Sequence, residues 1–176
     1  PTDRARGGVG GRLLPDAMGS GKTNRDFLRP LVEAGGEVAW FHPLRLRWFW
    51  QRPWLNLRTH RKIVVIDEAI AYTGGINITD EEDERLRKDA YRDLHLRVTG
   101  DVVRALQLVF VEDWAYATGT PPRVSPAPDA IPGDIASQVL VSGPDSSWEA
   151  IHRLHVGAIH GARRGVGLVA PYFGPW

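Results

Sequence analysis

The sequence predicts an α/β fold built from layers of strands and helices, and three observations lead to this class. Residues 9–41 show the succession strand, helix, strand that is typical of βαβ units. Residues 60–77 show the alternation of side chains that a β-hairpin requires. A further strand–helix–strand succession follows residue 134, and this repetition indicates an internal duplication.

Length and composition are those of an ordinary globular domain. The chain has 176 residues, of which 43% are hydrophobic and 24% are charged, so it can bury a substantial core. The net charge of +1 gives no strong field, and we expect no nucleic-acid partner. Cysteine is absent and the six histidines lack metal-ligand spacing, so the sequence predicts neither disulfides nor a metal site.

The first part of the chain predicts one βαβ unit. A strand is expected within residues 9–18, a helix over 24–34 with Asn24 as its cap, and a second strand over 37–41. Gly35 and Gly36 should end the helix. The predicted apolar stripe of the helix consists of Phe27, Leu28, Leu31 and Val32. Residues 1–11 lack both an initiator Met and the apolar core of a signal peptide, so we expect a chain that is incomplete at its N-terminus.

Residues 42–58 combine aromatic and basic side chains. Trp48, Trp50 and Trp54 alternate with arginines, a combination that suits the headgroup region of a membrane. The alternative is a loop whose tryptophans pack on the domain. No apolar run in the sequence reaches the roughly 18–20 residues that a membrane span needs.

The stretch 56–77 carries the residues with the clearest chemistry. His60 and Lys62 fall on one face of the first predicted strand, together with Val64 and Ile66, whereas Asp67 falls on the other face. The pattern as a whole is HxK, four residues, D, six residues and GGxN. Its members are His60, Lys62, Asp67, Gly74, Gly75 and Asn77.

A two-residue turn at 68–69 would bring these groups together. In that register Lys62 lies opposite Gly75 and His60 lies opposite Asn77, and opposed residues project to the same face. An imidazole, an ammonium and a carboxamide would then converge, and Gly75 would leave room for a ligand. A slip of one residue would send Asn77 to the wrong face.

This trio suits a phosphate diester. An imidazole such as that of His60 can attack phosphorus and carry the phosphoryl group covalently. Lys62 and Asn77 supply donors for the oxygens that gain charge in the transition state. Asp67 faces away in this register, so we interpret it as structural. The alternative is an ordinary buried hairpin with an isolated histidine and lysine.

The segment after the hairpin predicts a polar stretch, a strand and a helix. Residues 79–91 read as a solvated loop or helix, 92–100 as a strand and 101–119 as an amphipathic helix. The predicted apolar side of this helix consists of Val102, Ala105, Leu106, Val109, Phe110, Asp113 and Trp114.

The six-residue pattern resembles the HKD motif of the phospholipase D superfamily at the family's spacing. The resemblance implies an α-β-α sandwich with a mixed sheet, and phosphohistidine chemistry without a metal or other cofactor. It implies that Asp93 orients the catalytic imidazole, where the alternative is a surface aspartate at the start of a strand. It also implies that Lys62, Gly75 and Asn77 bind the substrate phosphate. The implied catalytic set is His60, Lys62, Asp67, Asn77 and Asp93.

The predicted domain organisation is one half of such a fold followed by the start of another. Residues 1–119 form the first half, 120–134 form a Pro-rich linker, and 135–176 begin a second half that stops before its own HKD motif. In the second half we expect a strand over 137–145, a helix over 146–164 and a further strand. The superfamily needs two HxK motifs, and this sequence contains one, so we expect a second half or a homodimer partner to complete the site.

The order of elements after residue 134 resembles that of bacterial cardiolipin synthases. This resemblance implies transfer between two phosphatidylglycerols, with release of glycerol, at the surface of a bacterial membrane with which this part associates peripherally. Anionic phospholipid is then the expected partner. The alternatives are a lipid-hydrolysing phospholipase D, a nuclease of the same fold, and a half-site that binds anionic lipid without turning it over.

A distant alternative is a P-loop ATPase or helicase. Residues 16–23, DAMGSGKT, look like a phosphate-binding loop, and VVIDEA at 64–69 looks like a Walker B strand. Asp16, however, stands where the P-loop pattern requires glycine. This interpretation also leaves His60 and Lys62 without a role.

Overall fold

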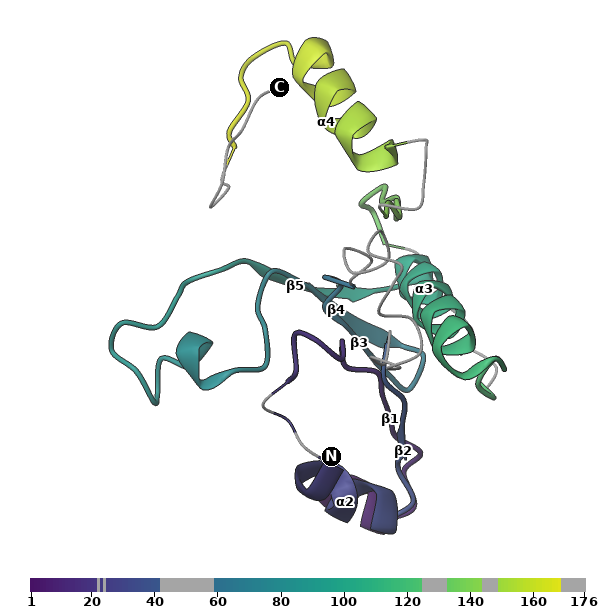
Figure 1. Ribbon diagram of the computed structural model, residues 1–176. Helices are drawn as coiled ribbons and strands as arrows, with labels where there is room; N and C mark the ends of the chain where they lie inside the picture. Colours follow the sequence, from purple (N-terminus) through teal and green to yellow (C-terminus); the bar gives the residue numbers. More distant parts are fainter. Residues whose placement is uncertain (22, 24, 42–58, 125–132, 144–148, 169–176) are drawn as a thin grey trace, which may run out of the picture. The chain divides into compact units, whose positions relative to one another are not determined.

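The computed structural model describes most of the chain as two compact units, Pro1–Val139 and Leu140–Trp176 (Figure 1). The residues described are 1–21, 23, 25–41, 59–124, 133–143 and 149–168. The helices are α1 (Thr2–Arg6), α2 (Arg25–Glu33), the 3-10 helix η3 (Asp80–Glu82), α3 (Asp101–Thr118) and α4 (Ala150–Gly161). The strands are β1 (Arg12–Leu13), β2 (Glu37–Val38), β3 (Ile63–Ile66), β4 (Ile70–Gly74) and β5 (His95–Thr99).

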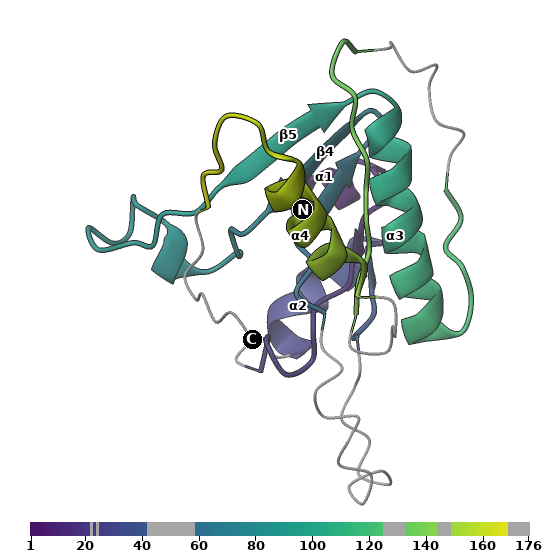
Figure 2. The same cartoon turned by 90° about the horizontal axis from the view of Figure 1, so that it is seen from above.

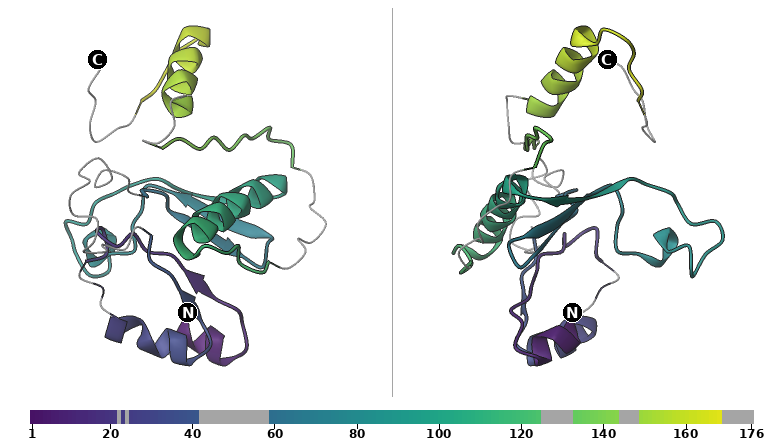
Figure 3. Two further views of the ribbon diagram at one scale, coloured as in Figure 1. Left: turned by 45° about the vertical axis from the view of Figure 1, so that its right-hand side comes forward. Right: turned by 180° about the vertical axis from the view of Figure 1, so that it is seen from behind.

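The N-terminal part is the predicted βαβ unit. Strands β1 and β2 pair in parallel, with Arg12 opposite Glu37, and these two side chains form an ion pair of 3.0 Å. Helix α2 connects the strands and lies beside β2 (Figure 3). Gly35, with φ of +93°, follows the helix and its N–H donates to the carbonyl of Val32, so the predicted helix end is confirmed.

A three-stranded antiparallel sheet, β3-β4-β5, forms the rest of the first unit. Helix α3 packs along one face of this sheet (Figure 2). Ala71 from β4 and Val103 and Leu106 from α3 are buried at the centre of this contact. The partly buried side chains around them are Ile63, Val65, Val98 and Val139.

Parallel and antiparallel pairing in one α/β unit confirms the predicted fold class. Two packing details differ from the sequence prediction. On α2, Leu28 and Leu31 are buried as expected, but Phe27 and Val32 are exposed. On α3, the buried position is Val103 and not Val102, because the helix turns that side chain toward β4.

Three features at the ends of the chain were predicted wrongly or not at all. Helix α1 was not predicted, since five residues are too few to show a periodic pattern. The described residues 137–143 and 165–168 form no strand, in contrast to the prediction. Helix α4 begins after Glu149, later than predicted, and the Pro-rich stretch 125–132 lies outside the described residues.

Candidate active site

The β3–β4 hairpin has a register one residue away from the predicted one. Ile63 pairs with Thr73, and continuing the ladder places Lys62 opposite Gly74 and not opposite Gly75. Strand β4 ends at Gly74, so Asn77 lies three residues beyond the ladder. The predicted pairing of His60 with Asn77 is therefore wrong, and the hairpin alone does not fix the direction of the Asn77 side chain.

The turn explains the shift in register. Asp67 and Glu68 both have positive φ values, 51° and 52°, as the two central residues of a type I′ turn do. The N–H of Ala69 donates to the carbonyl of Ile66 and closes the turn. Because Ile66 pairs with Ile70, the loop between the strands has three residues, 67–69, and not the predicted two, 68–69. Asp67 therefore sits at the tip of the hairpin, at the end of β3 away from His60. This position agrees with a structural role for Asp67.

The faces of the hairpin agree with the prediction. Ile63 and Val65 pack toward α3, whereas Val64 and Ile66 remain exposed on the opposite face. Arg61 also reaches α3, where its Nη1 donates to both carboxylate oxygens of Asp113 at 2.8 and 3.0 Å. Arg61 precedes β3, so this contact continues the packing of the hairpin on α3 beyond the paired residues.

Lys62 and His60 lie close together immediately before β3. The Nζ of Lys62 donates to the carbonyl oxygen of His60 at 2.9 Å, and the His60 side chain is exposed. An exposed imidazole with an ammonium group near its backbone is an accessible nucleophile beside a cation. This is the part of the predicted site that the structure brings together.

The glycine pair GG lets the start of β5 approach β4 closely. A Cβ at Gly74 would overlap the Leu94 carbonyl oxygen and the backbone of His95, and a Cβ at Gly75 would overlap the carboxylate of Asp93. The N–H of Gly75 also donates to the carbonyl of Leu94 at 2.9 Å. The space above Gly75, predicted to be free for a ligand, is thus occupied by the Asp93 carboxylate.

Asp93 is exposed, and its Oδ1 accepts from the N–H of Leu94 at 2.6 Å. No hydrogen bond joins Asp93 to His60, although both are among the described residues. An orienting hydrogen bond between catalytic groups often forms only when the substrate binds. The sequence prediction did not include His95, which lies opposite Gly74 with Nδ1 buried and no partner among the described residues.

Asn77 is held by a residue that the sequence analysis did not single out. Glu82 accepts from the Asn77 backbone N–H and from its side-chain Nδ2, each at 2.6 Å. This pair fixes the orientation of the carboxamide in the loop between β4 and η3. The acidic run of residues 80–84 was the only feature of the sequence that could have indicated this contact. The run does not show which of its carboxylates binds Asn77.

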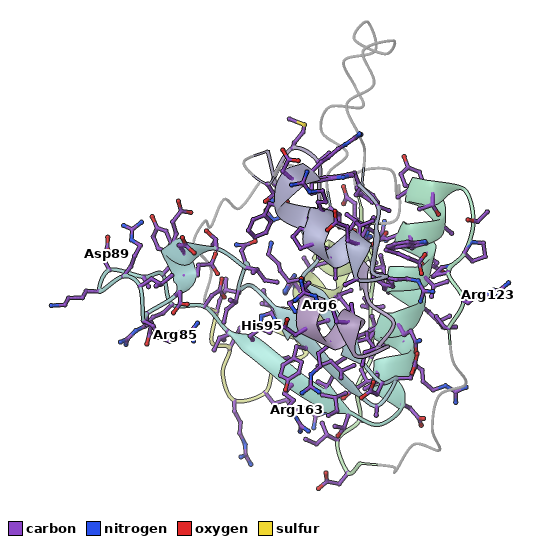
Figure 4. All side chains as sticks on the ribbon, turned by 90° about the horizontal axis from the view of Figure 1, so that it is seen from below. Arg6, Arg85, Asp89, His95, Arg123 and Arg163 are labelled. Atoms are coloured by element: carbon purple, nitrogen blue, oxygen red, sulfur yellow. The ribbon has the colours of Figure 1, made fainter. Side chains whose placement is uncertain are left out.

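Farther along this loop, arginines and aspartates form ion pairs with each other, Arg85 with Asp83 and Arg87 with Asp89. Hydrogen bonds from Arg85 lower the pKa of Asp83 to about 2, and Arg87 lowers the pKa of Asp89 in the same way. Figure 4 shows Arg85 and Asp89 on the outer part of the loop, away from His95. These arginines are therefore engaged locally and do not extend the site.

The stretch after β1 does not have the properties of a phosphate loop. Asp16 Oδ1 accepts from the backbone N–H groups of Met18 and Gly19 at 3.0 and 2.6 Å. The N–H of Ser20 donates to the Asp16 carbonyl. Three donors that would have to face a phosphate are thus satisfied within the loop. Lys22 lies outside the described residues.

The described residues hold no group of three or more acidic or histidine side chains arranged to bind a metal. Within the same residues, no helix combines the length and the apolar character needed to cross a membrane. The predicted lipid contacts of Trp48, Trp50 and Trp54 fall in 42–58, outside the described residues.

A βαβ unit, an antiparallel hairpin with histidine and lysine at its start, and a close-packed glycine pair define a phospholipase D-like α/β unit. No family model matches the chain, and no solved structure gives a significant match. The chain is 41% identical over 181 residues to the cardiolipin synthase of Geobacillus sp. strain WCH70. It is 39% identical over 180 residues to that of Halalkalibacterium halodurans, and 35% identical over 183 residues to cardiolipin synthase 1 of Bacillus anthracis.

Each of these alignments covers 98% of this chain, so the chain is a homologue of the bacterial cardiolipin synthases and shares their phospholipase D-like α/β fold. The resemblance seen in the sequence is thereby confirmed. The chain spans about a third of the length of these curated relatives, 35% for the first two and 36% for the third.

Proposed function

We propose that this chain supplies the first catalytic histidine of a phosphatidyltransferase that makes cardiolipin and glycerol from two phosphatidylglycerols. The observation that carries the proposal is the hydrogen bond from Lys62 to the carbonyl of His60, which places an exposed imidazole and a cation side by side at the base of the β3–β4 hairpin. The substrate class rests on the named relatives, because the side chains by themselves favour only a phosphate diester.

The proposed reaction has two steps. In the first, a ring nitrogen of His60 attacks the phosphorus of one phosphatidylglycerol, the bond to its terminal glycerol oxygen breaks, and a second imidazole protonates the departing glycerol. In the second, a glycerol hydroxyl of another phosphatidylglycerol attacks the phosphohistidine. The second imidazole accepts the hydroxyl proton, and His60 is released.

The other members of the site have supporting roles in this proposal. The ammonium of Lys62 and the carboxamide of Asn77 stabilise the charge that develops on the non-bridging oxygens. Asn77 has its orientation set by Glu82. Asp93 orients and stabilises the imidazolium form of His60, and the exposed side of the hairpin faces the membrane surface that delivers both lipids.

The test is made in the complete natural protein with labelled phosphatidylglycerol. We expect His60→Ala to abolish cardiolipin formation and Lys62→Ala to lower the rate by roughly 10²–10³, as for loss of an oxyanion donor. A matched control is Lys88→Ala, because Lys88 lies on the outer loop beyond η3. Phosphatidic acid as the main product would assign hydrolysis instead, and full activity of His60→Ala would refute the proposal.

A further inference from the structure

His60 belongs to a segment that the sheet does not hold. Strand β3 begins at Ile63, so residues 59–62 precede the hydrogen-bonded ladder. A nucleophile must nevertheless be kept within a fraction of an ångström of its productive position. The two residues adjacent to His60 show how this is achieved.

On one side of His60, Arg61 is tied to helix α3. Its guanidinium donates to both oxygens of Asp113, and the two side chains are only 29% and 19% exposed. A partly buried, two-oxygen pairing of this kind restricts orientation more than a surface ion pair does. Because Arg61 is adjacent to His60 in the chain, this contact anchors the backbone next to the imidazole.

On the other side, Thr59 is tied to the loop after β1. Its backbone N–H donates to Oδ2 of Asp16 at 3.2 Å, while Oδ1 of the same carboxylate holds Met18 and Gly19. Asp16 is itself part of an isolated parallel bridge with Phe41, three residues after β2 ends. One carboxylate thus connects the βαβ unit to the residue before His60.

We propose that Asp16 and Asp113 are positioning residues that hold the His60 segment from both sides. The inference deepens the proposed function and rests on it for the chemistry that is measured. Neither carboxylate touches the substrate; each acts through a neighbour of His60. This role also gives a function to the DAMGSGKT loop, residues 16–23. Its first residue, Asp16, holds the backbone of Thr59 next to His60.

Conservative variants of the complete natural protein separate this role from general stability. Asp16→Asn keeps an oxygen for Met18 and Gly19 but replaces one carboxylate oxygen by an NH₂ group, and Asp113→Asn removes the charge that binds Arg61. The matched control is Glu37→Gln, which removes an ion pair to an arginine of similar exposure, 27%, between β1 and β2.

We expect kcat for transfer to fall about 10- to 100-fold in Asp16→Asn and Asp113→Asn, with KM for phosphatidylglycerol unchanged. Amide hydrogen exchange at Thr59, whose N–H donates to Asp16, should accelerate about tenfold in Asp16→Asn, while exchange at 63–66 stays at the wild-type rate. The charge-reversed pair Arg61→Asp with Asp113→Arg should recover part of the lost kcat. Glu37→Gln should change none of these quantities.

Two results would overturn the inference. One is normal kcat in both variants in a protein that His60→Ala inactivates. The other is exchange in Asp16→Asn that accelerates equally at Thr59 and at 63–66, since that would show general destabilisation. If the wild-type protein forms no cardiolipin at all, the proposed function fails. Unchanged exchange at Thr59 in Asp16→Asn would then refute the positioning role of Asp16 independently.

Discussion

Arg61 ties the segment beside it to helix α3. Its side chain reaches Asp113 and donates to both carboxylate oxygens. The sequence pattern predicted the faces of the strand residues 63–66 correctly, because alternation depends only on local geometry. It did not predict the partner of Arg61, since Asp113 is 52 residues away in the chain.

The environment of Asp113 gives a prediction for the dependence of stability on pH. Burial raises the pKa of Asp113 above its ordinary value of 3.8, although Arg61 opposes this effect. Glu112 adds to the increase. The folded chain therefore holds this proton more tightly than the unfolded chain does, and the stabilising contribution is present at low pH and lost as pH rises through the raised pKa.

We therefore compare the thermal midpoints of wild type and Asp113→Asn between about pH 7 and about pH 4. The difference should shift in favour of the wild type as the pH is lowered through this window, because only the wild type gains the proton. A shift in favour of Asp113→Asn on acidification would mean that attraction by Arg61 outweighs burial, so that the pKa is lowered and not raised.

At the scale of elements, prediction from the sequence succeeded where the pattern was long or strongly periodic. Helix α3, the βαβ order and the strand of residues 95–99 were all expected within a few residues. The hairpin was expected too, but its register was wrong by one residue. Asp67 and Glu68 both adopt positive φ, and a glutamate is uncommon at such a position, so the residue types did not indicate this turn.

The prediction of strands in the C-terminal part, at residues 137–143 and 165–168, was wrong for a different reason. An apolar run such as residues 137–143 forms a strand only where a neighbouring strand offers backbone partners. The described part of the chain provides none for it, and Val139 packs instead on the core between β4 and α3. The close contact between Asp93 and Gly75 could not be predicted from the sequence either. It joins the residues next to two strands, β4 and β5, whose register the sequence does not determine.

The glycine pair between β4 and the loop gives a prediction at this scale. At Gly74 an added methyl group meets backbone atoms of Leu94 and His95, whereas at Gly75 it meets only the Asp93 side chain. We expect Gly74→Ala to destabilise the fold by about 1–3 kcal/mol, as overpacking typically does. Gly75→Ala should fold but displace the Asp93 carboxylate, lowering transfer about 100-fold.

The measurements are thermal unfolding and cardiolipin formation in the complete natural protein. Gly10→Ala is the matched control, because a methyl group there meets nothing within 4 Å. It should leave both quantities unchanged. Full activity of Gly75→Ala would contradict the assignment of Asp93 as the partner of His60.

The whole chain contains a single HxK pattern, yet the proposed reaction uses two imidazoles. His95 does not supply the second from this sheet. Its ring lies over Gly74, the residue that the ladder places opposite Lys62, and displacement at phosphorus requires the attacking nitrogen and the leaving oxygen to be roughly in line. The second imidazole must therefore approach from the other side of the phosphate.

We accordingly predict that the 176-residue chain, as a monomer, does not turn over phosphatidylglycerol at enzyme-like rates. Loss of a general acid alone typically costs about 10²–10⁴ in rate. Two copies that pair their open hairpin faces about a two-fold axis would bring two His60 side chains to one phosphate and restore part of the activity. The measurement is to separate monomer from dimer and to assay each fraction with labelled phosphatidylglycerol, using His60→Ala as the control. Activity confined to the dimer would support a symmetric two-histidine site, whereas a fully active monomer would show that one imidazole is enough.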